Sequence, residues 1–320
     1  MKKAHHTALL VSLTLSVVAQ GCGSKQEEVA TPPATSTAQG QTAAAADAKP
    51  QPYSYPAPAK GHYKEVNTGD FDLTDGIAYP AGKTGETIVW LTAKPVASPL
   101  LANSECPMTE ARALANLRDS PWLEVSLNPS GRSAYFAAGT PFGGSSREEE
   151  VGGGYWQSTA KISDNRIAGS IDYKNRGGAE FDLLISQPKI MQVSQNDWMQ
   201  GRHSEEAARL PAAAEVKALY QALHTAALAK DLKGILAAQG FSTEQIAAIR
   251  GLAGIDTDLV AFADRFLNPG TAEGPSSDPG YERGIMARGA NSKGENYANW
   301  YEFSTCGKRL LLTSIGLNPQ

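Results

Sequence analysis

The stretch RIAGSIDYKNRGGAEFDLLI, residues 166–185, indicates the fold class of the N-terminal half of this chain. Two runs in which apolar and polar residues alternate, RIAGSIDY and AEFDLLI, flank a glycine-containing turn at residues 174–178. Alternation with a period of two is typical of half-buried β-strands. Two such runs joined by a short turn predict an antiparallel pair.

Similar short runs precede this pair from residue 63 onward. They are ETIVWLT, LEVSL, RSAYFA and WQSTAKI, with turns at residues 128–131 and 163–165, and FDLTDGIAY, in which Asp75-Gly76 predicts a hairpin turn. One helix interrupts the series over 108–118, because Pro107 suits its first turn and Pro121 blocks its continuation. We therefore predict an antiparallel β barrel or sandwich with one helix over residues 63–190.

From about residue 200 the hydrophobic period changes to that of helices. A first helix, with Pro211 just inside its start, carries an apolar stripe. Ser242 and Gln245 form a capping box for a second helix, and Asp256 or Thr257 can cap a third. The stripe consists of Val216, Leu219, Leu223, Ala226 and Ala227. Three strand-like runs then follow at 282–288, 296–305 and 308–316. Helices followed by a three-stranded antiparallel meander predict an α+β domain over 200–320, and an α+β chain overall.

The first residues are typical of an export signal. Lys2 and Lys3 precede a mostly apolar run, 8–19, that is too short to cross a bilayer as a helix. A basic start, a short apolar run and small residues at a cleavage site predict a signal peptide over 1–21. An ordinary signal peptidase could cut after Gly21 and leave Cys22 as a thiol.

The sequence Ala19-Gln20-Gly21-Cys22 resembles the lipobox of bacterial lipoproteins. That resemblance implies cleavage before Cys22, diacylation of Cys22 and attachment to a lipid bilayer. Residues 22–62 suit a disordered tether, since Gly23 to His62 contains six Pro and ten Ala but no Leu, Ile, Phe, Met or Trp. Gly23 after the cysteine resembles the lipoproteins sorted to the outer membrane of Gram-negative bacteria.

Charge and cysteine content limit the partners and the compartment. The formal net charge is −4 and no cluster of Lys and Arg resembles a nucleic-acid footprint, so we expect no DNA or RNA partner. Beyond Cys22 the chain has only Cys106 and Cys306. In an exported protein an even pair is more often bonded than reduced, so we expect a Cys106–Cys306 disulfide.

No motif in the sequence fixes a reaction, a metal or a cofactor. The S-x-x-K, S-D-N and K-T-G triplets of penicillin-binding proteins all occur, but in the wrong order and on predicted strands and turns. Asp70, Asp72 and Asp75 lack the Gly and Glu positions of a calcium loop, so we interpret them as a solvated strand face. We therefore predict no catalytic residue and no cofactor.

Aromatic residues mark two candidate surfaces for a ligand or partner. Tyr155 and Trp156 directly follow the glycine-rich stretch 139–154, which we expect to be a hairpin connection. In the run NYANWYEF, Tyr297, Tyr301 and Phe303 share one strand face, while Trp300 and Glu302 occupy the other. One face of each strand is expected to be core, so the second face is the candidate surface.

Two weaker resemblances give no activity. The runs ETIVWLTAKPV and RIAGSIDY resemble uncharacterised exported domains of Gram-negative bacteria, and helices before a curved sheet resemble the nuclear-transport-factor superfamily. The leading hypothesis is a non-catalytic binding module of the cell envelope that recognises an unknown envelope protein or small ligand. The alternatives are a cell-envelope hydrolase with scattered carboxylates, which need no local motif, and a lipoprotein subunit of an envelope assembly.

Overall fold

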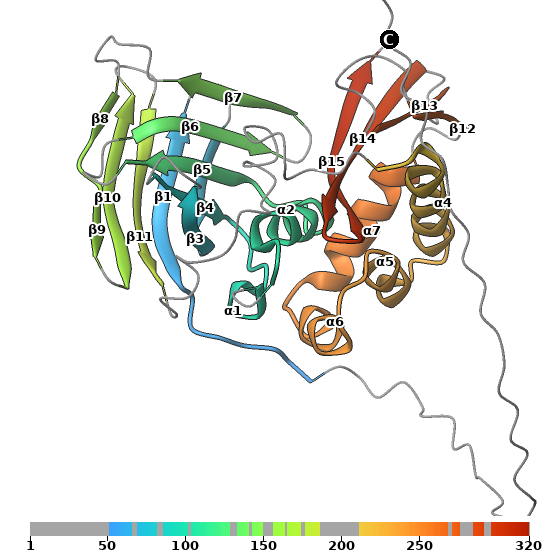
Figure 1. Cartoon of the computed structure of the whole chain (residues 1–320), viewed down its shortest axis with the longest axis horizontal. Helices are drawn as coiled ribbons and strands as arrows, with labels where there is room; N and C mark the ends of the chain where they lie inside the picture. The colour runs from blue at the N-terminus through green and yellow to red at the C-terminus, as the bar shows by residue number, and fades with distance from the viewer. Residues whose placement is uncertain are drawn as a thin grey trace, which may run out of the picture. The chain divides into compact units, whose positions relative to one another are not determined.

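The computed structural model describes residues 51–65, 69–81, 86–101, 104–128, 133–140, 143–149, 156–163, 165–173, 177–185, 211–267, 271–275, 284–290 and 296–319. These residues form three antiparallel sheets and six helices, so the predicted α+β class is confirmed (Figure 1). The strand orders of these residues close no barrel. None of the helices among them is long and apolar enough to cross a membrane.

The six-stranded sheet contains the pair of strands predicted from residues 166–185. Its order is β2-β1-β11-β10-β8, with β9 also paired to β10. Ile167 stands opposite Leu183, and Ile171 opposite Ala179, and all four side chains are buried. The bounds are β1 Ala59–Glu65, β2 Gly69–Leu73, β8 Trp156–Ser158, β9 Lys161–Ser163, β10 Arg166–Tyr173 and β11 Gly177–Leu184.

A five-stranded sheet with the order β3-β4-β5-β6-β7 packs beside the first. A Cβ atom on Gly76 of β3 would collide with Leu91 and the Trp90 carbonyl of β4, at 2.6 and 2.8 Å, and would lie 3.3 Å from a methyl carbon of Leu183 on β11. The bounds are β3 Asp75–Ala81, β4 Glu86–Thr92, β5 Trp122–Leu127, β6 Ser133–Thr140 and β7 Gly143–Glu149.

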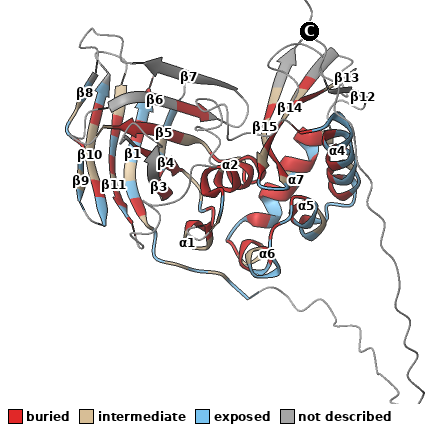
Figure 2. Cartoon of the chain, viewed as in Figure 1, coloured by how far each residue is buried: buried red, intermediate tan, exposed pale blue. Residues whose placement is uncertain are grey.

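Helix α2, Pro107–Leu117, is the most deeply buried helix of the described chain. It follows the short α1, Ser98–Leu101, and Figure 2 shows it buried along almost its whole length. Arg112 on one side binds Glu124 of β5, and Glu110 on another binds Arg309 of β15. A helix contacted from several sides has no solvent face, which explains its Ala- and Leu-rich sequence.

The C-terminal part contains four helices and a four-stranded sheet with the order β12-β13-β14-β15. The predicted stripe of α4 is buried, and Ser242 accepts a hydrogen bond from the backbone of Gln245 in the predicted capping box. The bounds are α4 Ala213–Leu228, α5 Leu232–Ala238, α6 Thr243–Arg250, α7 Ile255–Leu267, β12 Thr271–Pro275, β13 Gly284–Ala290, β14 Asn296–Cys306 and β15 Arg309–Pro319.

The structure corrects several sequence predictions. Asp75-Gly76 is not a hairpin turn, because β2 pairs with β1 and β3 pairs with β4, and the chain passes from one sheet to the other at Thr74. Residues 59–62 belong to β1 and not to the tether. The C-terminal meander has β12 as a fourth strand, and α1 is a second helix between β4 and β5. α7 begins at Ile255, one residue before the expected caps. α4 begins at Ala213 with Ala212 as its N-cap, so Pro211 lies before the helix and not inside it.

Candidate functional site

The two predicted aromatic surfaces belong to different sheets. Trp156 begins β8 of the six-stranded sheet, and Trp300 lies on β14 of the C-terminal sheet. Tyr155 and the side chain of Trp156 lie outside the described residues. The predicted loop 139–154 is not one connection, because residues 143–149 form β7, which pairs with β6. The structure therefore does not bring these two surfaces together as one site within a single sheet.

The alternation predicted for β14 is confirmed from Trp300 to Phe303, and the side chain of Tyr297 lies outside the described residues. Tyr301 and Phe303 are fully buried, and the ring centroids of Tyr301 and Phe266 of α7 are 4.8 Å apart. Trp300 and Glu302 are half-buried on the opposite face, and the indole of Trp300 covers the backbone of Gly284 on β13. This face carries an aromatic ring and a carboxylate two residues apart.

The disulfide between Cys106 and Cys306 is present. The two Cα atoms are 5.7 Å apart, although the residues are separated by 200 positions in the sequence. Cys106 is the N-cap residue of α2, and Cys306 is the last residue of β14. The disulfide therefore links the start of α2 to the C-terminal sheet.

Residues 51–58, QPYSYPAP, pack against the fold just before β1, and we call this segment the strap. The backbone N–H of Tyr53 donates to the carbonyl of Gly251, with the N and O atoms 2.9 Å apart. The Tyr55 hydroxyl donates to Asp75 and accepts from the backbone N–H of Ala97, whose nitrogen is 2.9 Å away. The predicted tether therefore ends before the strap and not at residue 62.

Asp75 is a fully buried carboxylate surrounded by donors. Besides Tyr55, the backbone N–H groups of Gly76 and Val96 donate to it at 2.8 and 2.7 Å, and Ser98 donates through both its hydroxyl and its backbone. Burial raises the pKa of the Asp75 carboxyl, and the hydrogen bonds from Ser98 and Tyr55 oppose this. The prediction of a solvated Asp75 is wrong, because its side chain is fully buried. Its carboxylate accepts hydrogen bonds from Val96 and from Ser98 at the start of α1.

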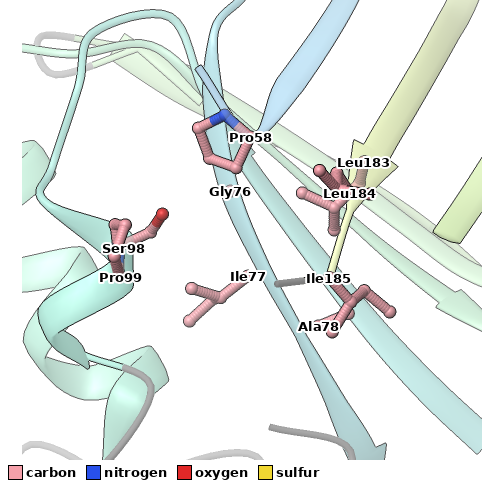
Figure 3. A pocket seen from close by; sticks show the side chains of 9 residues that line it. All are labelled: Pro58, Gly76, Ile77, Ala78, Ser98, Pro99, Leu183, Leu184 and Ile185. Carbon is pink, nitrogen blue, oxygen red and sulfur yellow. The ribbon is translucent and has the colours of Figure 1, made fainter. Parts of the chain in front are cut away.

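A small apolar hollow lies beside Ser98, between the end of the strap and β11 (Figure 3). The space open to the centres of water molecules is about 10 Å³, which is room for about one water. Nine residues line it: Pro58, Gly76, Ile77, Ala78, Ser98, Pro99, Leu183, Leu184 and Ile185. The hollow is too small for an organic ligand in this conformation.

Three other buried acids each bind a cation. Glu124 pairs with Arg112, Glu110 with Arg309, and Asp258 with both Arg118 and Lys94. These pairs connect α2 to β5, to β15 and to α7. These ion pairs account for the buried charges as contacts between elements of the fold.

Two exposed acids of β2, Asp70 and Asp72, lie beside His62, the last residue of the predicted tether. His62 of β1 has Asp70 2.8 Å from Nε2 and Asp72 2.9 Å from Nδ1. The two carboxylates therefore lie at opposite edges of the ring and do not converge on one point. Within the described ranges, no group of three His, Cys, Asp or Glu residues is placed to hold a metal ion.

Comparison with protein-family models, with curated proteins and with solved structures finds no match for this chain. The strap and the groups that bind it, Asp75, Ala97 and Gly251, form the site that the sequence analysis did not predict. The available signal was the repeated Tyr in PYSYP, at residues 52–56, within a segment otherwise poor in large apolar residues.

Proposed function

We propose that the chain is a lipid-anchored protein of the bacterial cell envelope, attached to the outer membrane through acylated Cys22. The sequence at its start carries the proposal, since Lys2, Lys3, the apolar run 8–19 and the lipobox-like residues 19–22 occur in the expected order. The Cys106–Cys306 bond supports it, because disulfides persist in oxidising compartments.

The tether in this proposal covers residues 23–50, since the strap is packed. A flexible chain of that length spans roughly 30 Å root-mean-square. Two acyl chains on one cysteine give stable membrane attachment, whereas one is marginal. The folded part would thus be held close to a bilayer while keeping considerable freedom of position.

We further propose that the folded part is a binding module with an N-terminal β sandwich and a C-terminal α+β domain. We place this ahead of hydrolysis because Asp75, Glu110, Glu124 and Asp258 are each engaged by donors or cations in the fold. The half-buried surface of Trp300 and Glu302 is a candidate contact for an envelope protein or small ligand.

Replacement of Cys22 tests the anchor. The Cys22→Ser variant should move from the membrane fraction to the soluble fraction, while Ser24→Ala, as a neighbouring control, should stay in the membrane. An intact mass of the purified mature chain should show the acyl groups and the loss of two hydrogens in the disulfide. Retention of the Cys22→Ser variant in the membrane would refute the proposed anchor.

The binding and hydrolysis readings can be separated directly. A photo-reactive residue in place of Trp300 should cross-link a defined envelope component in cells, and one in place of the exposed Lys217 of α4 serves as the control. Turnover of ester, amide or glycoside substrates by the purified chain would instead support the hydrolase.

A further inference from the structure

The strap is held by groups from distant parts of the sequence. Tyr53 contacts Gly251, which follows α6, whereas Tyr55 contacts Asp75 of β3 and Ala97, which precedes α1. These three groups bind the extended strap, and we call the surface that they form the strap groove. Its partners are two backbone groups and one carboxylate.

Gly251 is shaped to accept the strap. A Cβ atom at this position would lie 2.6 Å from the backbone nitrogen of Tyr53 and would also collide with the carbonyl oxygen of Gln51. The three nearest atoms that it would meet all belong to the strap. Gly251 has a φ angle of −86°, which any residue can adopt, so the glycine is required here by the close approach of the strap.

The groove distinguishes tyrosine from phenylalanine at position 55. The Tyr55 hydroxyl both donates to the Asp75 carboxylate and accepts from the N–H of Ala97. Ala97 has a φ angle of +57°, an uncommon conformation for a residue other than glycine, and this turn points its N–H toward the hydroxyl. A site that hydrogen-bonds a hydroxyl rejects the analogue without it, because the buried groups lose their partner.

Part of the strap groove is held by contacts that do not involve the strap. Asp75 retains donors from Gly76, Val96 and Ser98 when Tyr55 leaves, so the carboxylate stays in place. The strap contacts the fold through Tyr53, Tyr55 and Pro58, while its other five residues, Gln51, Pro52, Ser54, Pro56 and Ala57, are exposed. Segments with few buried contacts open locally at small free-energy cost. The strap can therefore exchange while the groove remains.

We propose that the strap groove is a binding site for an extended Tyr-x-Tyr-Pro segment of a partner protein, and that the strap is its intramolecular competitor. The sequence of the partner segment is inferred from the strap itself, since Pro52-Tyr53-Ser54-Tyr55-Pro56 forms hydrogen bonds with Gly251, Asp75 and Ala97. Proline-rich segments suit such grooves because they are extended before binding. The inference rests on the proposed binding role, but the groove does not depend on the lipid anchor.

Release of the strap should reveal the site. The probe is a fluorescent synthetic peptide with the sequence of residues 51–60, QPYSYPAPAK, and the protein is the full chain in detergent. A tethered competitor acts at an effective concentration of about millimolar, so the wild-type chain should bind the peptide weakly. The Tyr55→Ala variant, whose strap is released, should bind it at least about tenfold more tightly by fluorescence anisotropy.

Two controls make the assignment specific. Gly251→Ala added to Tyr55→Ala should abolish peptide binding, because the new methyl group fills the place of the peptide backbone. A peptide with Phe at the position of Tyr55 should bind at least about tenfold more weakly than the Tyr peptide. Equal binding of both peptides, or equal binding to both variants, would overturn the proposal.

A measurement on the wild-type chain removes dependence on any variant. Excess peptide should speed hydrogen exchange at the Tyr53 amide, which is bonded to Gly251. Unchanged exchange at millimolar peptide would overturn the proposal. Concentration-dependent dimers that Gly251→Ala abolishes would assign the groove to the strap of a second copy and would likewise overturn it. Loss of membrane anchoring in the Cys22→Ser variant affects none of these readouts.

Discussion

Arg118 and Asp258 stand 140 positions apart in the sequence and form a buried ion pair, with Arg118 Nε 2.8 Å from Asp258 Oδ2. Arg118 follows α2 and Asp258 lies in the first turn of α7. The same guanidinium donates to the carbonyls of Pro95 and Ala253 at 2.8 and 2.7 Å. Lys94 supplies the second cation, 2.7 Å from Asp258 Oδ1. One charged group thus connects the β-rich and helical parts of the chain.

Loss of Arg118 should destabilise the fold strongly. Arg118→Met leaves the buried Asp258 with one cation and deprives the carbonyls of Pro95 and Ala253 of their donor, so the free energy of unfolding should fall by about 3–5 kcal/mol. Lys94→Met is the matched control, because the Lys94 side chain is 36% exposed and should cost about 1 kcal/mol or less. Urea unfolding followed by circular dichroism measures both. Equal losses would show that the burial of Arg118 does not matter.

The disulfide should contribute more than any single hydrogen bond. Cys106 and Cys306 close a loop of 200 positions, and restriction of the unfolded chain on that scale corresponds to about 5 kcal/mol. A double variant, Cys106→Ala with Cys306→Ala, should therefore unfold at clearly lower urea. Its folded spectrum should persist, since Arg309 still binds Glu110 next to the lost bond. An unchanged urea midpoint would contradict the assigned stabilising role.

The hydroxyl of Tyr301 connects β14 to the end of α7. It donates to the carbonyl of Phe266 and accepts from the side-chain amide of Asn299, whose nitrogen is 3.2 Å away. Burial raises the pKa of this hydroxyl, so it stays protonated as a donor. Tyr301→Phe removes the hydroxyl but keeps the ring, and should cost about 1–3 kcal/mol in urea unfolding. A loss near zero would show that water replaces the hydroxyl.

Local patterns predicted the elements better than their connections. The alternation at 166–185 gave the β10–β11 pair, and the spacing from Val216 to Ala227 gave the buried face of α4. These patterns succeed because each reports which side of one element meets the core. The strand β12 was missed because TAEGP, residues 271–275, has neither alternation nor β-branched residues beyond Thr271.

The candidate groove could not be predicted for a different reason. Asp75-Gly76 has the composition of a turn, but the Asp75 side chain binds Val96 and Ser98, which are more than 20 positions away. Tyr53 meets Gly251 nearly 200 positions downstream. Neither partner is visible in the local sequence, and the Pro and Ala content of 23–62 favoured a tether throughout. The structure assigns the two tyrosines to the fold.

The exposed pair of Arg166 and Asp182 should give stability a specific pH dependence. Arg166 donates from Nε to Asp182 Oδ1 at 2.6 Å across β10 and β11, and this contact lowers the pKa of the Asp182 carboxyl. A carboxyl whose pKa is lower in the folded state stabilises the fold above its unfolded pKa, which is about 4. That contribution disappears as the pH falls through the folded pKa, because protonation removes the charge.

Comparison of the wild-type chain with Asp182→Asn isolates this contribution. The wild type should unfold at higher urea than the variant at pH 6–7, and the difference should close progressively below about pH 4. Glu180→Gln makes the same charge change two residues away on the same exposed face of β11, and so corrects for the overall loss of one negative charge. If the difference between Asp182→Asn and wild type stays constant down to about pH 2, the contact with Arg166 does not depend on the ionised carboxyl.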